Sequence, residues 1–223
     1  MRLLDLFCGA GGASEGYRRA GFEVVGVDLD RQKDYPFEFH QGDAIEFLRE
    51  HGHEFDAIHA SPPCQAYSIT RHAHDRKHPE LVEPVRDLLT VIRVPWVIEN
   101  VPGAPLHEPI VLCGSMFGLQ AWDHYIQQRV WLKRHRLFES SVALVAPDCQ
   151  HPKGMRVGGV YGGAWRKNRT LDPTVKRTGG YTPPDDVQRE LMGVDWMSRK
   201  ALNQAIPPVY AEYVGRQLME ACR

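Results

Sequence analysis

The first hundred residues alternate short apolar runs with stretches of helical periodicity. Apolar runs at residues 3–7, 24–27, 55–60 and 96–98 each have the length of a buried strand. Between the last two runs, helical spacing is carried by Leu81, Val85, Leu88, Leu89 and Ile92. Strands that alternate with helices predict a mostly parallel sheet covered by helices on both faces, the doubly wound α/β class.

A glycine-rich segment, DLFCGAGG at residues 5–12, joins the first run to a helix that opens near Ser14. Glycines at such a turn let the backbone approach a ligand, although a tight packing turn has the same composition. The dinucleotide pattern GxGxxG is not met, because Ser14 stands where its third glycine would fall. Asp28 ends the second run, and Asp43 ends a possible further strand, so the loop and the two acids indicate an adenosine-containing cofactor.

Cys64 lies directly after two prolines at the end of an apolar run, in HASPPCQAYS at residues 59–68. Neither proline donates a backbone hydrogen bond, so the chain leaves the sheet on a stiff path. This placement suits a nucleophile and also an inert loop thiol. Glu99 ends the next run, at the sheet edge where ligands of open α/β sheets bind, and a role in capping a loop is the alternative.

Two arginines stand two residues apart in LKRHRLFES, at residues 132–140. On a strand, Arg134 and Arg136 would point to the same side, so both are expected to face one site. A surface ladder of ion pairs is the alternative.

The second half of the chain has a different character. Residues 140–181 are rich in Gly, Pro and basic side chains without a clear period, which predicts an irregular lobe. A helix is expected from about residue 182 to Gly193, and a final helix after Pro207 and Pro208. Residues 153–177 contain seven Lys or Arg and one Asp, a local charge of +6 in a chain whose net charge is −1. This stretch is either a nucleic-acid surface or a solvated basic face.

The five cysteines are scattered, odd in number and without a CxxC pair, so we expect reduced thiols and neither a disulfide framework nor a cysteine-rich zinc site. His72, His74 and His78 invite a metal hypothesis, but a hydrophilic loop explains them, and we predict no metal. The start of the sequence has no pattern of a secretory signal, and no run is long enough to span a membrane.

Taken together, these stretches resemble the DNA (cytosine-5) methyltransferase family. DLFCGAGG resembles its first motif, SPPCQAYS its PCQ motif with the nucleophilic cysteine, ENV its glutamate motif, LKRHRLF its QxRxR motif and NQAIPPVYAEYVG its last motif. The resemblance implies the fold of the S-adenosylmethionine-dependent methyltransferases and that cofactor. It also implies a catalytic domain at 1–139 and 182–223 and a short target-recognition lobe at 140–181.

The resemblance assigns roles to particular residues. The implied catalytic residues are Cys64, Glu99, Arg136 and Arg134. The implied cofactor contacts are Phe7, Gly9, Gly11, Asp28, Asp43 and Asn203, and the implied DNA contacts are Gln65, Ser68, Arg166, Lys167 and Arg169. The implied substrate is double-stranded DNA with a flipped cytosine, handled by a monomer in the cytoplasm of a prokaryotic cell or a virus-infected host.

Two departures and two alternatives accompany this interpretation. Leu132 stands where the family usually has the glutamine of QxRxR, and the recognition stretch of about forty residues is much shorter than usual, so target selectivity is expected to be simple. An RNA cytosine-5 methyltransferase acting on transfer RNA is one alternative, although the CFT tripeptide of that branch is missing. A DNA-binding member without turnover is the other. A nicotinamide oxidoreductase would explain only the glycine loop.

Overall fold

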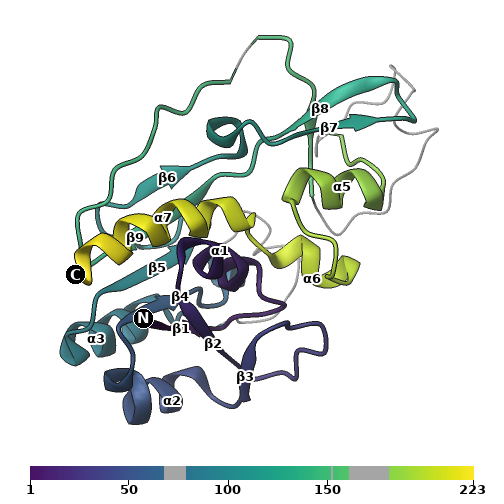
Figure 1. Ribbon diagram of the computed structural model, residues 1–223. Helices are drawn as coiled ribbons and strands as arrows, with labels where there is room; N and C mark the ends of the chain where they lie inside the picture. The colour runs from purple at the N-terminus through teal and green to yellow at the C-terminus, as the bar shows by residue number, and fades with distance from the viewer. Residues whose placement is uncertain (68–78, 152, 161–180) are drawn as a thin grey trace.

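The computed structural model describes residues 1–67, 79–151, 153–160 and 181–223 (Figure 1). In chain order, the elements before the second sheet are β1 (Arg2–Leu6), α1 (Gly12–Ala20), β2 (Glu23–Asp28), β3 (Glu38–Gln41), α2 (Ala44–His51), η1 (Gly52–Glu54), β4 (Ala57–Ala60), η2 (Cys64–Ala66), α3 (Val82–Ile92), β5 (Trp96–Asn100), β6 (Ile110–Leu112) and η4 (Gly114–Phe117). They are followed by β7 (Gln120–Asp123), β8 (Gln128–Leu132), β9 (Arg136–Ser140), β10 (Val157–Gly158), α5 (Asp185–Met192), α6 (Arg199–Gln204) and α7 (Pro208–Ala221).

The main sheet has seven strands in the described ranges, in the order β3-β2-β1-β4-β5-β9-β6. The first five strands run parallel, and β9 pairs antiparallel with both β5 and β6. The carboxyl ends of the parallel strands therefore meet at one edge of the sheet. The chain order reverses between β1 and β4, and ligands of open α/β sheets bind beside such a reversal.

Alternate side chains of each strand enter different cores. Leu3 faces Tyr17 of α1 and Tyr210 of α7 on one side of the sheet. Leu4 and Leu6 face α2 and α3 on the other side, in a separate apolar cluster. Figure 1 shows α1 and α7 on one face and α2 and α3 on the other. The predicted doubly wound, mostly parallel α/β class is confirmed.

Helix α7 lies close against α1 because glycine replaces side chains at the contact. A Cβ at Gly16 would lie only 2.1 Å from the carbonyl oxygen of Pro208, and one at Gly12 would lie 2.7 Å from that of Ile206. The close approach brings the loop before α7 beside the glycine-rich turn after β1. Within the described ranges, none of the helices combines the length and the hydropathy needed to cross a bilayer.

A second, three-stranded sheet in the order β10-β8-β7 lies beside the main sheet (Figure 1). Its apolar cluster joins Val130 and Leu132 of β8 with Leu191 of α5 and Leu202 of α6. This core draws on residues before and after the 140–181 stretch that the sequence marks as the lobe, because β8 pairs with β7 on one side and with β10 on the other. The second structural unit is therefore wider than that stretch.

Candidate active site

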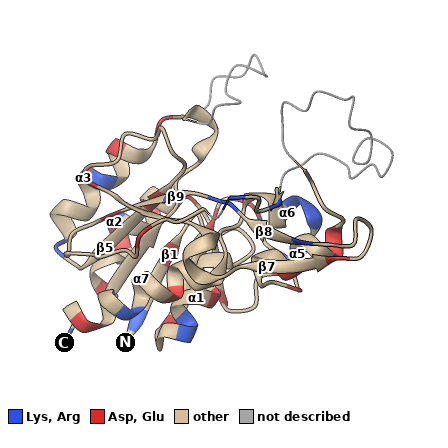
Figure 2. Cartoon of the chain, turned by 90° about the horizontal axis from the view of Figure 1, so that it is seen from above, with Lys and Arg blue, Asp and Glu red and all other residues tan. Residues whose placement is uncertain are grey.

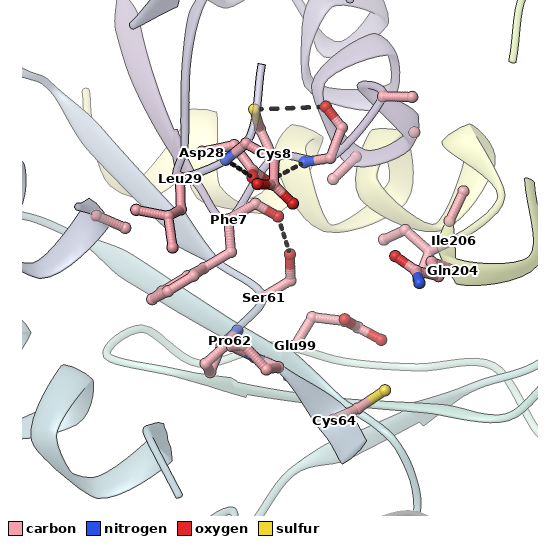
Figure 3. Close-up of a pocket in the computed structure, with 18 of the residues that line it drawn as sticks. Phe7, Cys8, Asp28, Leu29, Ser61, Pro62, Cys64, Glu99, Gln204 and Ile206 are labelled. Carbon is pink, nitrogen blue, oxygen red and sulfur yellow. Dashed lines mark hydrogen bonds between the residues drawn. The ribbon is translucent and has the colours of Figure 1, made fainter. Parts of the chain in front are cut away.

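A pocket of about 440 Å³ opens at the carboxyl edge of the main sheet. Its walls come from the segments that follow β1, β2, β4 and β5, from the start of β9, and from the loop between α6 and α7. Figure 3 shows Asp28 and Cys8 at one end, Glu99 and Cys64 at the other, and Gln204 and Ile206 along the side.

The glycine-rich turn adopts a backbone that few residue types tolerate. Phe7, Gly9 and Gly11 all have positive φ, at 59°, 50° and 85°. Phe7 is held in this left-handed region while its carbonyl accepts a 3.2 Å hydrogen bond from Ser61 Oγ. Phe7 and Gly9 line the pocket as expected. Gly11 instead caps α1 and packs under Tyr35, so its predicted contact with a ligand has no counterpart in the pocket wall.

The two strand-end acids both line the pocket and also organise the backbone around it. Asp28 accepts hydrogen bonds from the amides of Gly9 and Asp30, at 2.9 and 3.0 Å. Asp43 caps α2, since its Oδ1 accepts from the amides of Ile45 and Glu46 at 2.8 and 3.1 Å. Each carboxylate oxygen can accept more than one hydrogen bond, so both acids keep capacity for a ligand.

Cys64 begins η2 directly after the two prolines and lines the pocket half-buried. The amide of Asn100, at the end of β5, donates a 2.9 Å hydrogen bond to the carbonyl of Pro62. This buried bond fixes the segment that leads to Cys64. The sequence marks Asn100 only as part of ENV, and its anchoring role emerges from the fold.

Glu99 is 6% exposed and points into the pocket beside Cys64 (Figure 3). Arg136 Nε lies 3.1 Å from Glu99 Oε1, an ion pair in which the N–H is not aligned with that oxygen. Glu99 Oε1 therefore has no hydrogen-bond donor among the described residues. Burial raises the pKa of Glu99, while Arg136 and then Arg134 lower it. The geometry leaves a carboxyl oxygen ready for a ligand's polar edge.

Two thiols line the pocket, and their surroundings differ. Burial raises the pKa of Cys8 far above its usual range, and the carboxylates of Asp5 and Asp28 raise it further. Burial also raises the pKa of Cys64, as does Glu99, but there the guanidinium of Arg136 lowers it. Since a thiolate is the nucleophilic form, the cation beside Cys64 makes it the better nucleophile of the two.

Arg134 does not face the pocket, and the expectation that both arginines serve one site is wrong. Only Arg136 lines the pocket, because β9 begins at Arg136 and the strand alternation does not extend back to Arg134. The guanidinium of Arg134 is buried and donates to the carbonyls of Val160, Asn203 and Ala205, at 3.1, 2.8 and 2.8 Å. Leu132 is also buried, in the apolar cluster of the second sheet.

Asn203, a predicted cofactor contact, does not line the pocket. Its carbonyl accepts from Arg134, and its side chain is not part of the pocket wall, whereas the next residue, Gln204, lines the pocket with Ile206. The last motif alone does not determine which side chain near the end of α6 faces the pocket. In the structure it is Gln204, the last residue of the helix. Ser61 is a further pocket residue that the sequence did not single out.

Among the predicted DNA contacts, Gln65 is exposed at the pocket rim. Ser68, Arg166, Lys167 and Arg169 lie outside the described residues, as do the three loop histidines. Other basic residues are described: α6 and the stretch before β9 both carry Lys and Arg (Figure 2).

Comparison with known proteins gives the family. Residues 1–108 match the model of the C-5 cytosine-specific DNA methylase family. The Type II methyltransferase M.HgiGI of Herpetosiphon aurantiacus is 32% identical over 123 residues, which are 48% of this chain and 96% of that protein. The chain belongs to the C-5 cytosine-specific DNA methylase family.

Other members of this methylase family are longer than the matched region. The Type II methyltransferase M.FnuDI of Fusobacterium nucleatum is 34% identical over 113 residues, and the match spans 46% of this chain and only 33% of M.FnuDI. The structure of the Dnmt2 methyltransferase of S. pombe superposes with a TM-score of 0.63 at 12% identity, covering 99% of this chain and 98% of that one. The predicted methyltransferase fold is confirmed.

Proposed function

We propose that this chain transfers a methyl group from S-adenosylmethionine to carbon 5 of a cytosine flipped out of double-stranded DNA, with Cys64 as the nucleophile. The observation that carries the proposal is one pocket that contains both the glycine loop with its strand-end acids and Cys64 with Glu99. A methyl donor and a base bound there would lie side by side. Membership of the methylase family supports cytosine as the base.

The residues at one end of the pocket fit the methyl donor. A Cβ at Gly9 would meet nothing within 4 Å, so the backbone there is open to a ligand. Phe7, Asp28 and Asp43 would hold the adenosine part, with the two carboxylates accepting hydrogen bonds from hydroxyl and amino groups. S-adenosylmethionine, when bound, supplies an electrophilic methyl group.

Cys64 supplies the covalent step. Its thiolate adds to carbon 6 of the ring, the sulfur–carbon bond forms, and the electron pair of the double bond becomes available at carbon 5. After methylation, a base removes the proton on carbon 5, the double bond re-forms and the thiolate leaves. Glu99, whose pKa burial raises, would hydrogen-bond ring nitrogen 3 as an acid and draw electrons from the ring. Arg136 would stabilise both the thiolate and the negative charge near the base.

A cytosine stacked in a duplex cannot reach Cys64 inside a pocket, so the base must be flipped out of the helix. Gln65 at the rim is suited to contact the flipped nucleotide or its neighbours. We expect Lys and Arg contacts with phosphates to position the duplex, which makes binding weaken steeply as salt increases.

The test is incubation of the purified protein with S-adenosylmethionine labelled on its methyl group and with duplex DNA, single-stranded DNA or transfer RNA. Label is expected on duplex DNA. Cys64→Ser should abolish both labelling and covalent trapping on DNA that contains 5-fluorocytosine. Cys222→Ser is the matched control, since Cys222 lies at the end of α7 and its thiol donates to the carbonyl of Asp56.

Each of the other outcomes is informative. Label on transfer RNA alone would replace DNA with RNA as the substrate, and absence of label on every nucleic acid would contradict the proposal. Trapping that persists in Cys64→Ser would assign the nucleophile to another residue. Bisulfite sequencing of DNA from expressing cells would then read the recognised sequence.

A further inference from the structure

Four potential metal ligands meet at the junction of β6, β9 and the segment that follows β9. They are Cys113, His135, Cys149 and His151, and their ligand atoms all lie within 4.8 Å of one another. Cys113 follows β6, His135 precedes β9, and the other two stand two residues apart in the irregular segment. The scattered cysteines predict no metal site, but the fold gathers two of them with two histidines.

The distances within this cluster match those of a four-coordinate site. His151 Nε2 lies 3.4 Å from Cys113 Sγ and 3.3 Å from Cys149 Sγ, and His135 Nε2 lies 3.4 Å from Cys149 Sγ. In tetrahedral zinc sites, bonds of about 2.3 Å to sulfur and about 2.0 Å to nitrogen place these atoms about 3.5 Å apart. The centroids of the two imidazole rings lie 5.2 Å apart, and the rings are inclined by 80° to each other.

The surroundings of the cluster support thiolate ligands. Cys113 is fully buried, and the backbone amide of Met116 is directed at its side chain in the first turn of η4. A Cβ at Gly114 would lie 2.4 Å from the carbonyl of Leu132, so this turn is pressed against β8. Ser115 Oγ lies 3.9 Å from Cys149 Sγ. Polar groups that contact the ligands in this way orient them for a metal.

We propose that Cys113, His135, Cys149 and His151 bind one zinc ion in a structural site. Two thiolates and two imidazoles are a ligand set that zinc prefers, and four protein ligands leave no position for a substrate. The proposal does not depend on methyl transfer, because none of the four residues lines the catalytic pocket.

The ion would attach the irregular segment after β9 to the main sheet. The described residues between β9 and β10 contain neither helix nor strand. Val145 is tied to Gln217 of α7 by hydrogen bonds of 2.9 and 3.2 Å, and the metal would add a second attachment close to His135. His135 stands between Arg134 and Arg136, so the same ion would also fix the backbone that carries both arginines.

The experiment is elemental analysis of the full chain purified without chelators and with a reductant. We expect about one zinc per chain. Cys149→Ser and His151→Asn should each lose most of the metal, and Cys222→Ser should retain it. Removal of zinc by a chelator should lower the melting temperature, and added zinc should restore it.

A second measurement guards against variants that fail to fold. Cobalt(II) added to metal-free wild-type protein should give the intense charge-transfer absorption of thiolate ligands in tetrahedral geometry. Wild-type protein that contains no zinc and gives no such absorption would overturn the proposal. A disulfide between Cys113 and Cys149 in freshly purified protein would also overturn it. Metal content is read without any methylation assay, so a failure of the proposed activity and a failure of this site are distinguishable.

Discussion

The carboxyl edge of β1 to β5 and the region from β6 to β10 differ in how their polar side chains are positioned. At the edge, each functional side chain lies at the end of its own strand, as Asp28 and Glu99 do, or a few residues after it, as Cys64 does. From β6 onward, polar side chains join segments that are distant in sequence, as Arg134 does with Val160, Asn203 and Ala205. The sheet positions the pocket residues directly, whereas the second region depends on individual polar contacts.

The largest effects on stability and activity are expected from replacing Arg134 and Arg136 one at a time. Arg134→Ala leaves three backbone carbonyls without their buried donor, which should cost about 3 kcal/mol or more in the free energy of unfolding. Arg136→Ala should cost far less stability but lower methyl transfer by about 10²-fold, because Arg136 faces Glu99 and the pocket.

Urea denaturation and initial methylation rates would check this pair. Arg134→Lys should recover only a part of the stability, because an ammonium group lacks the planar fork that reaches several carbonyls. Equal stabilities of the two alanine variants would contradict the division between a structural and a catalytic arginine.

The pH dependence of stability should arise largely within the main sheet. Burial raises the pKa of Asp5 from 3.8 to about 7, although Ser14 donates a hydrogen bond to it. Because the folded chain holds this proton more tightly than the unfolded chain, stability should fall as pH rises from about 4 to 7, by up to about 4 kcal/mol. Asp5→Asn should remove that fall.

His59, which pairs with Asp5 in the β1–β4 register, acts in the opposite direction. Burial lowers its pKa from 6.5 to about 3, so the folded chain loses stability as pH falls through that interval.

Urea denaturation of wild type and Asp5→Asn across pH 4 to 8 isolates the Asp5 contribution. Parallel stability curves for the two proteins would contradict the assignment.

A smaller loss is expected in the second sheet. Tyr181 donates a buried hydrogen bond to Asp123 Oδ2, and Asp123 Oδ1 accepts from the amides of Tyr125 and Ile126. Tyr181→Phe should destabilise the protein by about 1–2 kcal/mol. Calorimetric titration with S-adenosylmethionine should show unchanged affinity, since neither residue lines the pocket. A large loss of affinity would mean that the two regions are coupled.

The smallest effect concerns the reactivity of Cys64. Glu99 raises the pKa of this thiol, so Glu99→Gln should lower it and speed alkylation by iodoacetamide at pH 8 severalfold. Arg136→Ala should slow the same reaction. Mass spectrometry of the Cys64 peptide separates this thiol from the others, and an unchanged rate in both variants would show that the two charges do not act on it.

The sequence is informative where function follows local chain order. The apolar runs predict β1, β2, β4 and β5, and the residues after them are the ones that line the pocket. Prediction fails where long-range packing decides orientation. The sequence Arg134-His135-Arg136 gives no indication that β9 begins only at Arg136. The cluster of cysteines and histidines cannot be predicted from the sequence for the same reason, since its members come from three separate segments.

The contact between the glycine-rich turn and the segment after α5 has a consequence for protein synthesis. Trp196 Nε1 donates a 2.9 Å hydrogen bond to the carbonyl of Ala10, across 186 residues of sequence, and Ile206 completes the pocket wall beside Gly12. A ribosome-bound chain that ends before Ile206 has its parallel strands but lacks one wall of the pocket. A ligand that binds this pocket therefore stabilises chains that include Ile206 more than shorter ones.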